Sequence, residues 1–458
     1  MSGKYQSYPK YKQVAEDWLP IGIPTHWITK KVQFLLKDGQ EGIKIGPFGS
    51  ALKLEDMVDN GYRVYGQENV IKRDFSIGKR AISKNKFTEM SVYAIRERDV
   101  LVTMMGTSGK CQLVPETAET GIIDSHLLRL RLNEREVIPE LFCMLLDECH
   151  ELKYQIGKQG KGSIMHGLNS SIVKNLCLPL PPLEEQRSIL AFLDHETAKI
   201  DALIEKQQQL IKLLKEKRQA VISHAVTKGL NPDAPMKDSG VEWLGEVPAH
   251  WEVKRLKHIS PKIGVGLVIN PSHYVQDEGV HFLFGGDLSE YGFRLNKTRK
   301  MSDANSRKLY QSRLKEHDLV CVRVGYPGVT AVIPKELEGS NCASMMIIRR
   351  GDFDSQWLSY SLNSDLGKNQ VERVQYGAAQ KQYNIADAIE FRFPVPAKDE
   401  QIAISSYLDA QRKKFNSLIL HAEQAIKLMQ ERRTALISAA VTGKIDVRNF
   451  KADDTNAA

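Results

Sequence analysis

Four polar side chains in the first half of the chain have chemistry suited to contacting a nucleic acid. Gln67 and Asn69 carry amides, which can pair with the hydrogen-bonding edge of adenine. Lys72 and Arg73 are cations and suit backbone phosphates better than base edges. The two amides could equally cap a turn, so the residue types leave both roles open.

Two glycine-containing segments extend this set. Thr107 and Ser108 lie between glycines, a pattern that lets backbone approach a phosphate but that also suits a simple hairpin turn. Ser163, His166 and Asn169 lie in a second segment punctuated by glycine and are candidate groove contacts. We therefore expect loops of the first half to carry the contacts.

The second half of the chain offers a comparable set of polar, cationic and aromatic residues. They are Arg294, Lys297 and Arg299 in one basic stretch, Arg323 and Tyr326 near a glycine, and Gln380, Lys381, Gln382 and Tyr383 in a third segment. One basic stretch lies in each half of the chain, at 72–86 and at 293–308. Both suit contact with a polyanion, and ordinary solvated loops are the alternative explanation.

An enzyme acting on DNA by itself is an alternative that needs a catalytic motif. NPSHY (270–274) lacks the second proline of an NPPY-type methyltransferase motif, and GVG (264–266) is too slight for a nucleotide-binding turn. SGK (108–110) is not part of a GxxxxGK[ST] loop. The nuclease-like strings ELK (151–153) and EVK (252–254) arise readily by chance. We therefore expect no catalytic residue, no metal ligand and no cofactor bound by this chain.

The composition is ordinary for a globular protein and slightly basic. The 458 residues are 42% hydrophobic and 26% charged, enough for about two to four domains, and the net charge of +8 mildly favours a polyanionic partner. Six scattered cysteines without a CxxC pair argue against structural zinc and disulfides, and favour a reducing cytoplasm. We expect no membrane span, because no apolar run of about 18 residues exists, and no secretory signal.

The chain contains a long internal repeat. Residues 179–228 and 394–443 align without a gap, 215 residues apart, and 22 of the 50 positions are identical. A second echo relates 16–32 to 241–256, with the Pro, His and Trp of IPTHW matched in VPAHW at a spacing of 224. The middles between these frames do not visibly align, which indicates a constant frame around two different inserts. Their short β-like runs and glycine-rich turns predict an α+β domain in each middle.

The gapless repeat predicts two long helices, because residues 183–226 contain no proline or glycine and apolar residues recur at helical spacing. The predicted pairing stripe comprises Leu193, Ile200, Ile204, Ile211, Leu214 and Val221, followed by Ala225, and in the second copy Leu408, Phe415, Ile419, Ile426, Met429 and Leu436, followed by Ala440. Such a narrow stripe needs a partner, and the other copy suits it in an antiparallel pair. Packing of each helix on its own domain is the alternative. Arg218 and Arg433 interrupt the stripe at the same repeat position, which is a way to fix register.

The chain resembles the specificity (S) subunits of type I restriction–modification systems over nearly all of 16–446. The resemblance rests on PLPPLEEQ and its diverged copy PVPAKDEQ, on the IPTHW and VPAHW segments, and on motifs of the middles. These motifs are GPFGSALK, YGQENV, VTMMGTSGKCQLVP, GKGSIMHGLN and DLVCVRVGYPGVTAVIP. The second copy reads GAAQKQYN where the first has GSIMHGLN, so positional transfer of contacts is weaker there.

By that resemblance, each middle is a target recognition domain that reads one half of an asymmetric bipartite site in double-stranded DNA. The helices set the unread spacer and dock two methyltransferase (M) subunits, and restriction/translocase (R) subunits join the complex. S-adenosylmethionine would then be bound by the M subunits, and ATP with Mg²⁺ by the R subunits, in a bacterial or archaeal cytoplasm. A coiled-coil scaffold without a DNA role is a further alternative.

The expected fold is α+β, with two pseudo-repeated target recognition domains separated by two long helices that pair as an antiparallel coiled coil. The expected segments are a tail (1–15), domain 1 (16–182), helix 1 (183–228), a linker (229–240), domain 2 (241–397), helix 2 (398–446) and a tail (447–458). The terminal residues 1–14 and 447–458 look poorly ordered from their composition.

Overall fold

The computed structural model divides the chain into two compact units. Unit 1 comprises residues 1–207 and 424–458, and unit 2 comprises residues 208–423. The structure describes residues 5–14, 19, 21–37, 39–159, 168–268, 271–377 and 380–451. Each unit contains one middle and half of each long helix. The expected segments instead listed the helices separately from the domains. No helix within the described ranges is long and apolar enough to cross a membrane.

Unit 1 is a mixed α/β assembly of short strands. Its strands are β1 (Tyr11–Lys12), β2 (Ile23–Pro24), β3 (Ile28–Lys31), β4 (Ile43–Ile45), β5 (Met57–Val58), β6 (Tyr62–Tyr65), β7 (Ala81–Ile82), β8 (Val100–Thr103), β9 (Cys111–Leu113), β10 (Gly121–Ile123), β11 (Leu127–Leu130) and β12 (Cys177–Leu180). Its helices, besides the long pair, are α1 (Gln67–Ile71), α2 (Lys84–Glu89), α3 (Pro139–Glu148), α4 (His150–Gln159) and α5 (Ser170–Asn175).

Unit 2 has elements of the same kinds. Its strands are β13 (Met236–Asp238), β14 (Glu246–Pro248), β15 (Glu252–Arg255), β16 (Ile263–Val265), β17 (Val280–Leu283), β18 (Leu288–Ser289), β19 (Gly292–Phe293), β20 (Arg299–Met301), β21 (Leu319–Cys321), β22 (Thr330–Val332), β23 (Asn341–Cys342), β24 (Met346–Ile348) and β25 (Arg392–Val395). Its short helices are α7 (Leu256–Ile259), α8 (Asp303–Lys308), α9 (Ser355–Asn363), α10 (Asp365–Val374) and α11 (Ile385–Ala388).

The two units repeat the same sheet topology. The order β4-β11-β8-β9 of unit 1 recurs as β16-β24-β21-β22 in unit 2, and the pair β3-β12 recurs as β15-β25. A second sheet in each unit contains a parallel pair, β6 with β10 and β17 with β23. The expectation of two pseudo-repeated α+β domains is therefore confirmed, and the repetition extends into the middles that the sequences alone did not align.

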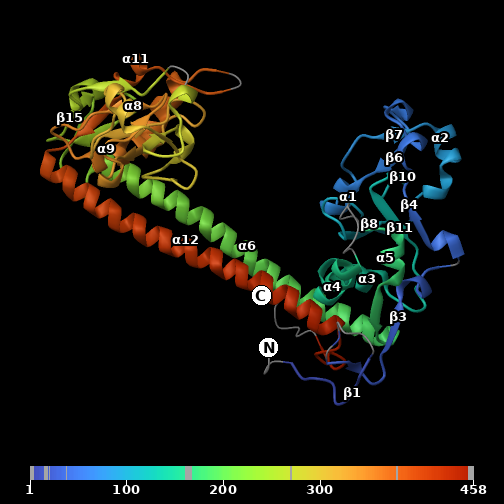
Figure 1. Cartoon of the computed structure of the whole chain (residues 1–458). Helices are drawn as coiled ribbons and strands as arrows, with labels where there is room; N and C mark the ends of the chain where they lie inside the picture. Colours follow the sequence, from blue (N-terminus) through green and yellow to red (C-terminus); the bar gives the residue numbers. More distant parts are fainter. Residues whose placement is uncertain are drawn as a thin grey trace. The chain divides into compact units, whose positions relative to one another are not determined.

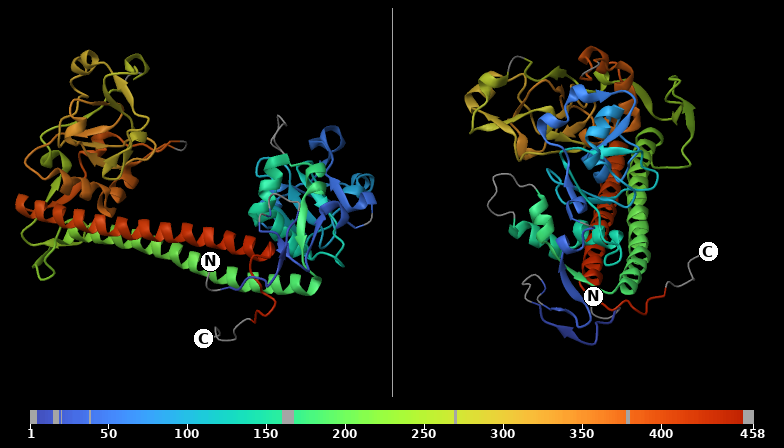
Figure 2. Two further views of the ribbon diagram at one scale, coloured as in Figure 1. Left: turned by 60° about the horizontal axis from the view of Figure 1, so that its bottom comes forward. Right: turned by 90° about the vertical axis from the view of Figure 1, so that its right-hand side faces the viewer.

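The repeated segments form the helices α6 (Leu183–Lys228) and α12 (Lys398–Val441). Glycines with positive φ follow both, Gly229 at 77° and Gly443 at 73°, as expected for a residue that ends a helix. Within each unit one half of α6 lies beside one half of α12, as Figures 1 and 2 show. Unit 1 joins the first half of α6 to the last half of α12, and unit 2 the reverse, so the pair is antiparallel as predicted.

The two arginines that interrupt the stripe make equivalent contacts. Arg218 donates from Nη1 to Oδ1 of Asn416 at 2.6 Å, and Arg433 donates from Nε to Oδ1 of Asp201 at 3.0 Å. Asp201 and Asn416 are themselves related by the spacing of 215. Each arginine thus reaches the same repeat position of the facing helix, which fixes one register for the antiparallel pair.

The predicted stripe residues lie on the packed side of the helices. Leu193, Ile200, Leu408, Phe415, Ile419 and Leu436 are buried, and Ile204, Ile211, Leu214, Val221, Ile426 and Met429 are half-buried. In unit 1, Leu193 and Leu436 belong to one apolar core with strands of the domain. In unit 2, Leu408 belongs to a core that includes Trp251 and Trp357. The helices therefore pack on the domains as well as on each other, so both arrangements considered from the sequence occur together.

A repeated polar joint closes each unit where its domain begins and ends. In unit 1 the Glu185 carboxylate, at the start of α6, accepts a hydrogen bond from Trp27 Nε1 at 3.0 Å and lies 2.7 Å from His26 Nε2. In unit 2 Glu400 accepts from Trp251 Nε1 at 2.9 Å and lies 2.9 Å from His250 Nε2. The duplicated His-Trp segments and the duplicated helix starts are therefore the two sides of one joint.

The terminal segments of the described chain are packed rather than loose, in contrast to the expectation from composition. Tyr8 is 3% exposed and hydrogen-bonds Glu185, and Val447 is 3% exposed in the same apolar core. The Phe450 ring packs edge-on against Phe192 with centroids 5.1 Å apart. Aromatic residues in an otherwise polar tail supply the apolar area that stabilises this packing.

Candidate nucleic-acid interface

The most closely matched parts of the two middles are β-hairpins with glycine tips. The hairpin of unit 1 (99–115) and that of unit 2 (318–334) align without a gap at a spacing of 219. Gly109 N donates to Thr103 O at 2.8 Å, and Gly328 N donates to Val322 O at the same distance. The middles do not visibly align in sequence, but in the structure these hairpins correspond strand by strand. Few side chains match, whereas the backbone is the same.

A buried ion pair braces the base of each hairpin. Asp99 accepts from Arg131 Nε at 3.0 Å in unit 1, and Asp318 accepts from Arg349 Nη1 at 2.7 Å in unit 2. Burial raises the pKa of the Asp99 carboxyl, an effect that the Arg131 guanidinium opposes. These four residues were not among the predicted site residues. The gapless match of the two hairpins is a sequence signal that could have found Asp99 and Asp318, whereas Arg131 and Arg349 lie outside it.

The tips of the hairpins carry different exposed side chains. Thr107 and Ser108 occupy the tip of unit 1, both exposed, between Gly106 and Gly109, whose φ angles are 66° and 84°. Tyr326 occupies the same place in unit 2, and its side chain is 83% exposed. The positive φ angles need glycine, so the frame of the tip is fixed while its contact residues are free to differ.

A second loop adjoins the hairpin tip in each unit. In unit 2, Gly325 N donates to Lys381 O at 2.9 Å and Tyr383 N donates to Arg323 O at 3.3 Å. In unit 1, Leu168 N donates to Met104 O at 2.9 Å, at positions equivalent to Tyr383 and Arg323. The structure thus brings the second-half candidates from 323–326 and 380–382 together on one edge of unit 2.

Tyr383 is an exception within this loop and is corrected to a core residue. It is 1% exposed, its hydroxyl lies 3.1 Å from Cys321 Sγ, and burial raises its pKa. It fills the place that Leu168 fills in unit 1, so it cannot present its ring to a ligand from this position. Gln380 and Lys381 are exposed and Gln382 is half-buried, and these three keep their candidacy.

The corresponding loop of unit 1 is only partly described. Ser163 and His166 lie outside the described residues, so their predicted role stays a prediction. Asn169 is exposed and caps α5, with Oδ1 accepting from Ile172 N at 2.9 Å. Its Nδ2 group has no hydrogen bond among the described residues, so the amide can still donate to a ligand.

The candidates on and after α1 divide into structural and exposed residues. Asn69 is 1% exposed, and its Oδ1 accepts from Gly66 N while its Nδ2 donates to the Asp74 and Ile77 carbonyls. It braces the loop, so the prediction that it reads a base is corrected. Gln67 is half-buried and Lys72 is exposed.

Arg73 is exposed but anchored beside the first hairpin. It adopts a φ of 55°, and its Nη2 lies 3.5 Å from Asp147 Oδ2, while Lys110 Nζ lies 2.6 Å from Oδ1 of the same carboxylate. Arg73 is therefore held in place by a buried carboxylate. A DNA phosphate would have to compete with Asp147 for its guanidinium.

The basic stretch of unit 2 is largely available. Arg294 and Lys297 are exposed, and neither has an ion-pair partner within the described ranges. Arg299 is exposed and its guanidinium lies 4.7 Å from the centroid of the Phe284 ring. Two free cations beside a stacked third one form a surface suited to phosphates.

The nuclease-like strings have structural roles. Glu151 in α4 accepts a hydrogen bond from Lys444 Nζ at 2.6 Å and another from Ser438 Oγ. Glu252 and Lys254 on β15 pair with each other at 3.0 Å. Glu151 is therefore part of a buried contact with the end of the chain, and Glu252 and Lys254 form a surface ion pair on a strand.

Comparisons with known proteins agree with the observed architecture. The family model for the type I restriction modification DNA specificity domain matches residues 51–213. The type I restriction enzyme MjaVIII specificity subunit of Methanocaldococcus jannaschii is 23% identical over 377 residues, 78% of this chain and 81% of that protein. A second specificity subunit of the same archaeon, of the MjaX system, is 25% identical and covers 93% of this chain and 95% of its own length.

The likeness extends to a solved structure. A chain from a study of complex assembly and conformational transition of the type I R-M system superposes with a TM-score of 0.67 at 18% identity. The match covers 93% of this chain and 100% of the other, so the two share a fold over that part of this chain.

Proposed function

Since this chain belongs to the family of type I restriction–modification specificity subunits, we propose that it selects the DNA sequence on which a methyltransferase and nuclease complex acts. The chain itself carries out no catalysis in this proposal, and it works in the cytoplasm of a bacterium or archaeon, where the DNA lies. S-adenosylmethionine is held by the methyltransferase subunits, and ATP with Mg²⁺ by the restriction subunits.

One observation carries the proposal: two hairpins with the same backbone present different tips. Thr107 and Ser108 at one tip offer hydroxyls, which can donate or accept, whereas Tyr326 at the other offers a large ring. Identical frames with different contact groups suit the reading of two different half-sites. The target is therefore bipartite and asymmetric, with an unread spacer between its halves.

The contacts divide into positioning and reading residues. Arg294, Lys297 and Lys72 are exposed cations and bind phosphates, which fix the register on the duplex. The tip residues and the adjoining loop residues Gln380 and Gln382 reach base edges in a groove. Phosphate contacts give salt-dependent affinity, whereas the base contacts give discrimination.

The helices offer a repeated surface for two copies of a partner. Outside the pairing stripe, unit 1 exposes Leu203 (51%) and Leu428 (65%), and unit 2 exposes their repeat equivalents Leu418 (42%) and Leu213 (61%). Large exposed apolar residues in a helical pair favour protein contacts. Because the set occurs twice, it suits two identical methyltransferase subunits, with restriction subunits joining that core.

The proposal is tested by expressing the chain in a methylation-free host, alone and with its neighbouring methyltransferase subunit, and mapping N6-methyladenine by single-molecule sequencing. A split motif with a fixed gap that appears only with both proteins supports the proposal. Methylation by this chain alone would make it an enzyme instead. If neither culture shows a motif, a DNA-binding titration against salt decides, because the non-specific attraction of a basic scaffold is lost as salt rises to about 0.15 M, whereas a DNA-recognition subunit still binds.

The tips provide a sharper test within the same assay. Thr107→Tyr with Ser108→Pro gives the first hairpin the tip residues of the second. The expected result is a changed or degenerate first half of the motif with an unchanged second half. A change in both halves, or in neither, would contradict reading by the tips. Glu116→Ala, an exposed change in the same domain, is the control.

A further inference from the structure

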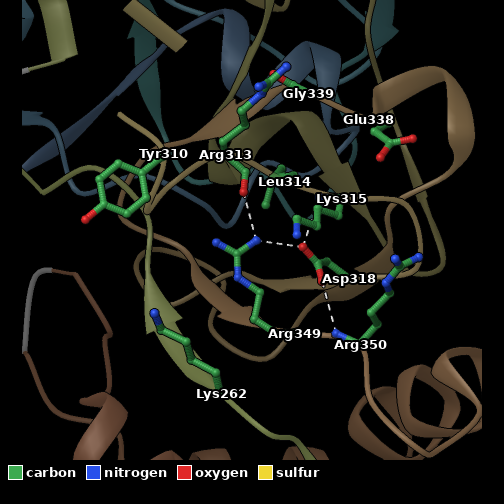
Figure 3. Close-up of a pocket in the computed structure, with 10 residues that line it drawn as sticks. All are labelled: Lys262, Tyr310, Arg313, Leu314, Lys315, Asp318, Glu338, Gly339, Arg349 and Arg350. Atoms are coloured by element: carbon green, nitrogen blue, oxygen red, sulfur yellow. Dashed lines mark hydrogen bonds and ion pairs between the residues drawn. The ribbon is translucent and has the colours of Figure 1, made fainter. Parts of the chain in front are cut away.

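Unit 2 has a cationic pocket over the buried Asp318–Arg349 bridge. The cavity has a volume of about 760 Å³, and Figure 3 shows the five cations that surround it. They are Lys262, Arg313, Lys315, Arg349 and Arg350. The pocket lies at the Asp318 end of β21, whereas the proposed reading tip follows the opposite end of that strand. The pocket is therefore separate from the candidate base contacts.

The carboxylate inside the pocket neutralises only one of these cations. Asp318 Oδ2 accepts from Arg349 Nη1 at 2.7 Å and from the backbone N of Lys315 at 2.9 Å, while Oδ1 accepts from Arg350 N at 3.0 Å. Its hydrogen-bonding capacity is thus used by Arg349 and by backbone. Among the described residues, the side chains of the other four cations form no ion pair, and Glu338 is the one further acid in the lining. The lining carries a net charge of +3.

The equivalent place in unit 1 shows that the bridge does not require these cations. Gly42 O accepts from Arg131 N at 2.9 Å, as Lys262 O accepts from Arg349 N at 3.0 Å. Gly42 therefore occupies the position of Lys262. A glycine stands where unit 2 has an exposed lysine.

The same correspondence identifies two further differences. Ala94 O accepts from Arg131 at 3.1 Å, as Arg313 O accepts from Arg349 at 2.8 Å, so Ala94 occupies the position of Arg313. Leu132, which follows Arg131, corresponds to Arg350. In unit 1 the carboxylate of Glu41 also pairs with Arg131 at 2.7 Å. At these three positions unit 1 therefore has glycine, alanine and leucine where unit 2 has three cations, and besides Arg131 it keeps a cation, Arg96, only at the position of Lys315.

We propose that the pocket of unit 2 binds the phosphates of a nucleotide. The net charge of +3 comes from cations that form no ion pair among the described residues. Such a charge suits a polyphosphate better than an anion with one negative charge. The volume lies in the range of small-molecule sites. Tyr310, 69% exposed, lines the same pocket and offers a ring on which a base can stack.

Two sources offer this chemistry: a free nucleoside triphosphate, and the backbone of DNA that extends beyond the recognised half-site. The test uses the full-length chain with ATP and with tripolyphosphate, each titrated by calorimetry at low salt. The key variant, Lys262→Gly with Arg313→Ala and Arg350→Leu, carries the residues of unit 1, whose bridge is stable with them. The control, Lys212→Ala with Lys215→Ala and Lys217→Ala, removes the same charge from exposed positions on α6.

With a free nucleotide as ligand, wild type and control bind ATP, and the pocket variant, which lacks three cations, binds about tenfold or more weakly. Tyr310→Ala then weakens ATP but not tripolyphosphate. With DNA backbone as ligand, ATP binding is weak, and the pocket variant loses DNA affinity with a salt slope reduced by about 2 to 3. If the pocket variant and the control agree in the titrations with ATP and tripolyphosphate and also in a DNA titration against salt, the proposal is wrong. The single variant Lys262→Gly, at an exposed position, serves if the triple variant fails to fold. Failure here would leave DNA recognition by the tips untouched.

Discussion

The two polar joints share a histidine, a tryptophan and a glutamate, yet they should contribute differently to the free energy of unfolding. Replacing each glutamate by alanine measures the difference. Glu185 has a side chain only 6% exposed and serves two buried donors, the hydroxyl of Tyr8 and Nε1 of Trp27. The variant Glu185→Ala leaves both donors unpaired in a dry place. At about 1–3 kcal/mol for each buried donor, the loss in the free energy of unfolding should be about 4 kcal/mol.

The equivalent change in unit 2 should cost much less. The Glu400 side chain is 30% exposed and His250 is 55% exposed, so water can replace the carboxylate. Tyr11 pairs with Pro24 as Met236 pairs with Pro248, so Tyr8 corresponds to Asp233, which is exposed. Besides His250 and Trp251, no side chain of the described residues donates to Glu400. For Glu400→Ala we expect a loss of about 1–2 kcal/mol.

The comparison is made by equilibrium urea unfolding, with hydrogen-exchange mass spectrometry to assign each loss to its unit. Glu184→Ala and Asp399→Ala, at exposed neighbouring positions, are matched controls and should change the free energy by less than about 0.5 kcal/mol. Equal losses for Glu185→Ala and Glu400→Ala, or protection lost first in unit 2, would refute the reasoning from burial.

Three further outcomes follow from the described contacts. Asn69→Ala should lower the free energy of unfolding of unit 1 by about 2 kcal/mol, because one buried and two half-buried backbone groups lose partners, and it should leave the methylated motif unchanged where the protein still folds. Tyr326→Ala should weaken DNA binding and degrade only the second half of the motif, as read by methylation mapping, whereas an unchanged motif would remove the ring from the contact surface. Although burial opposes it, hydrogen bonds from Lys444 and Ser438 lower the pKa of Glu151 below its ordinary 4.5. The stability this gives is complete above pH 4.5 and lost as the pH falls through the lower folded-state pKa, so acid unfolding of Glu151→Gln should show a smaller loss in that range.

The sequence predicted the helices well because their period is local and regular. Leu193 and Leu408 lie on the packed sides, and the antiparallel pairing of the repeat copies was expected. The shared hairpin was missed because its side chains have diverged, leaving little beyond Gly106, Gly109 and their counterparts to align. Backbone geometry preserves such a hairpin with few identities, since only the positions with positive φ demand a residue type.

The errors among candidate contacts have a common physical cause. Asn69 and Tyr383 have the residue types of a reader, but an amide can satisfy a loop and a tyrosine can replace a leucine in a core. Residue type alone does not distinguish these roles, because burial depends on the fold around the side chain. The cationic pocket was not expected either, because Lys262, Arg313 and Arg350 are far apart in the sequence.

The polar joint has a consequence for how such genes can change. Trp27 and Glu185 lie at the two ends of one reader segment and hydrogen-bond each other, so the segment begins and ends at the same place. Trp251 and Glu400 do the same in the other unit. A recombination event that exchanges everything between these ends would transfer the segment together with both sides of its joint. The new segment would still have to pack on retained helix residues such as Leu193 and Leu436, so the helices limit which segments can be exchanged without loss of stability.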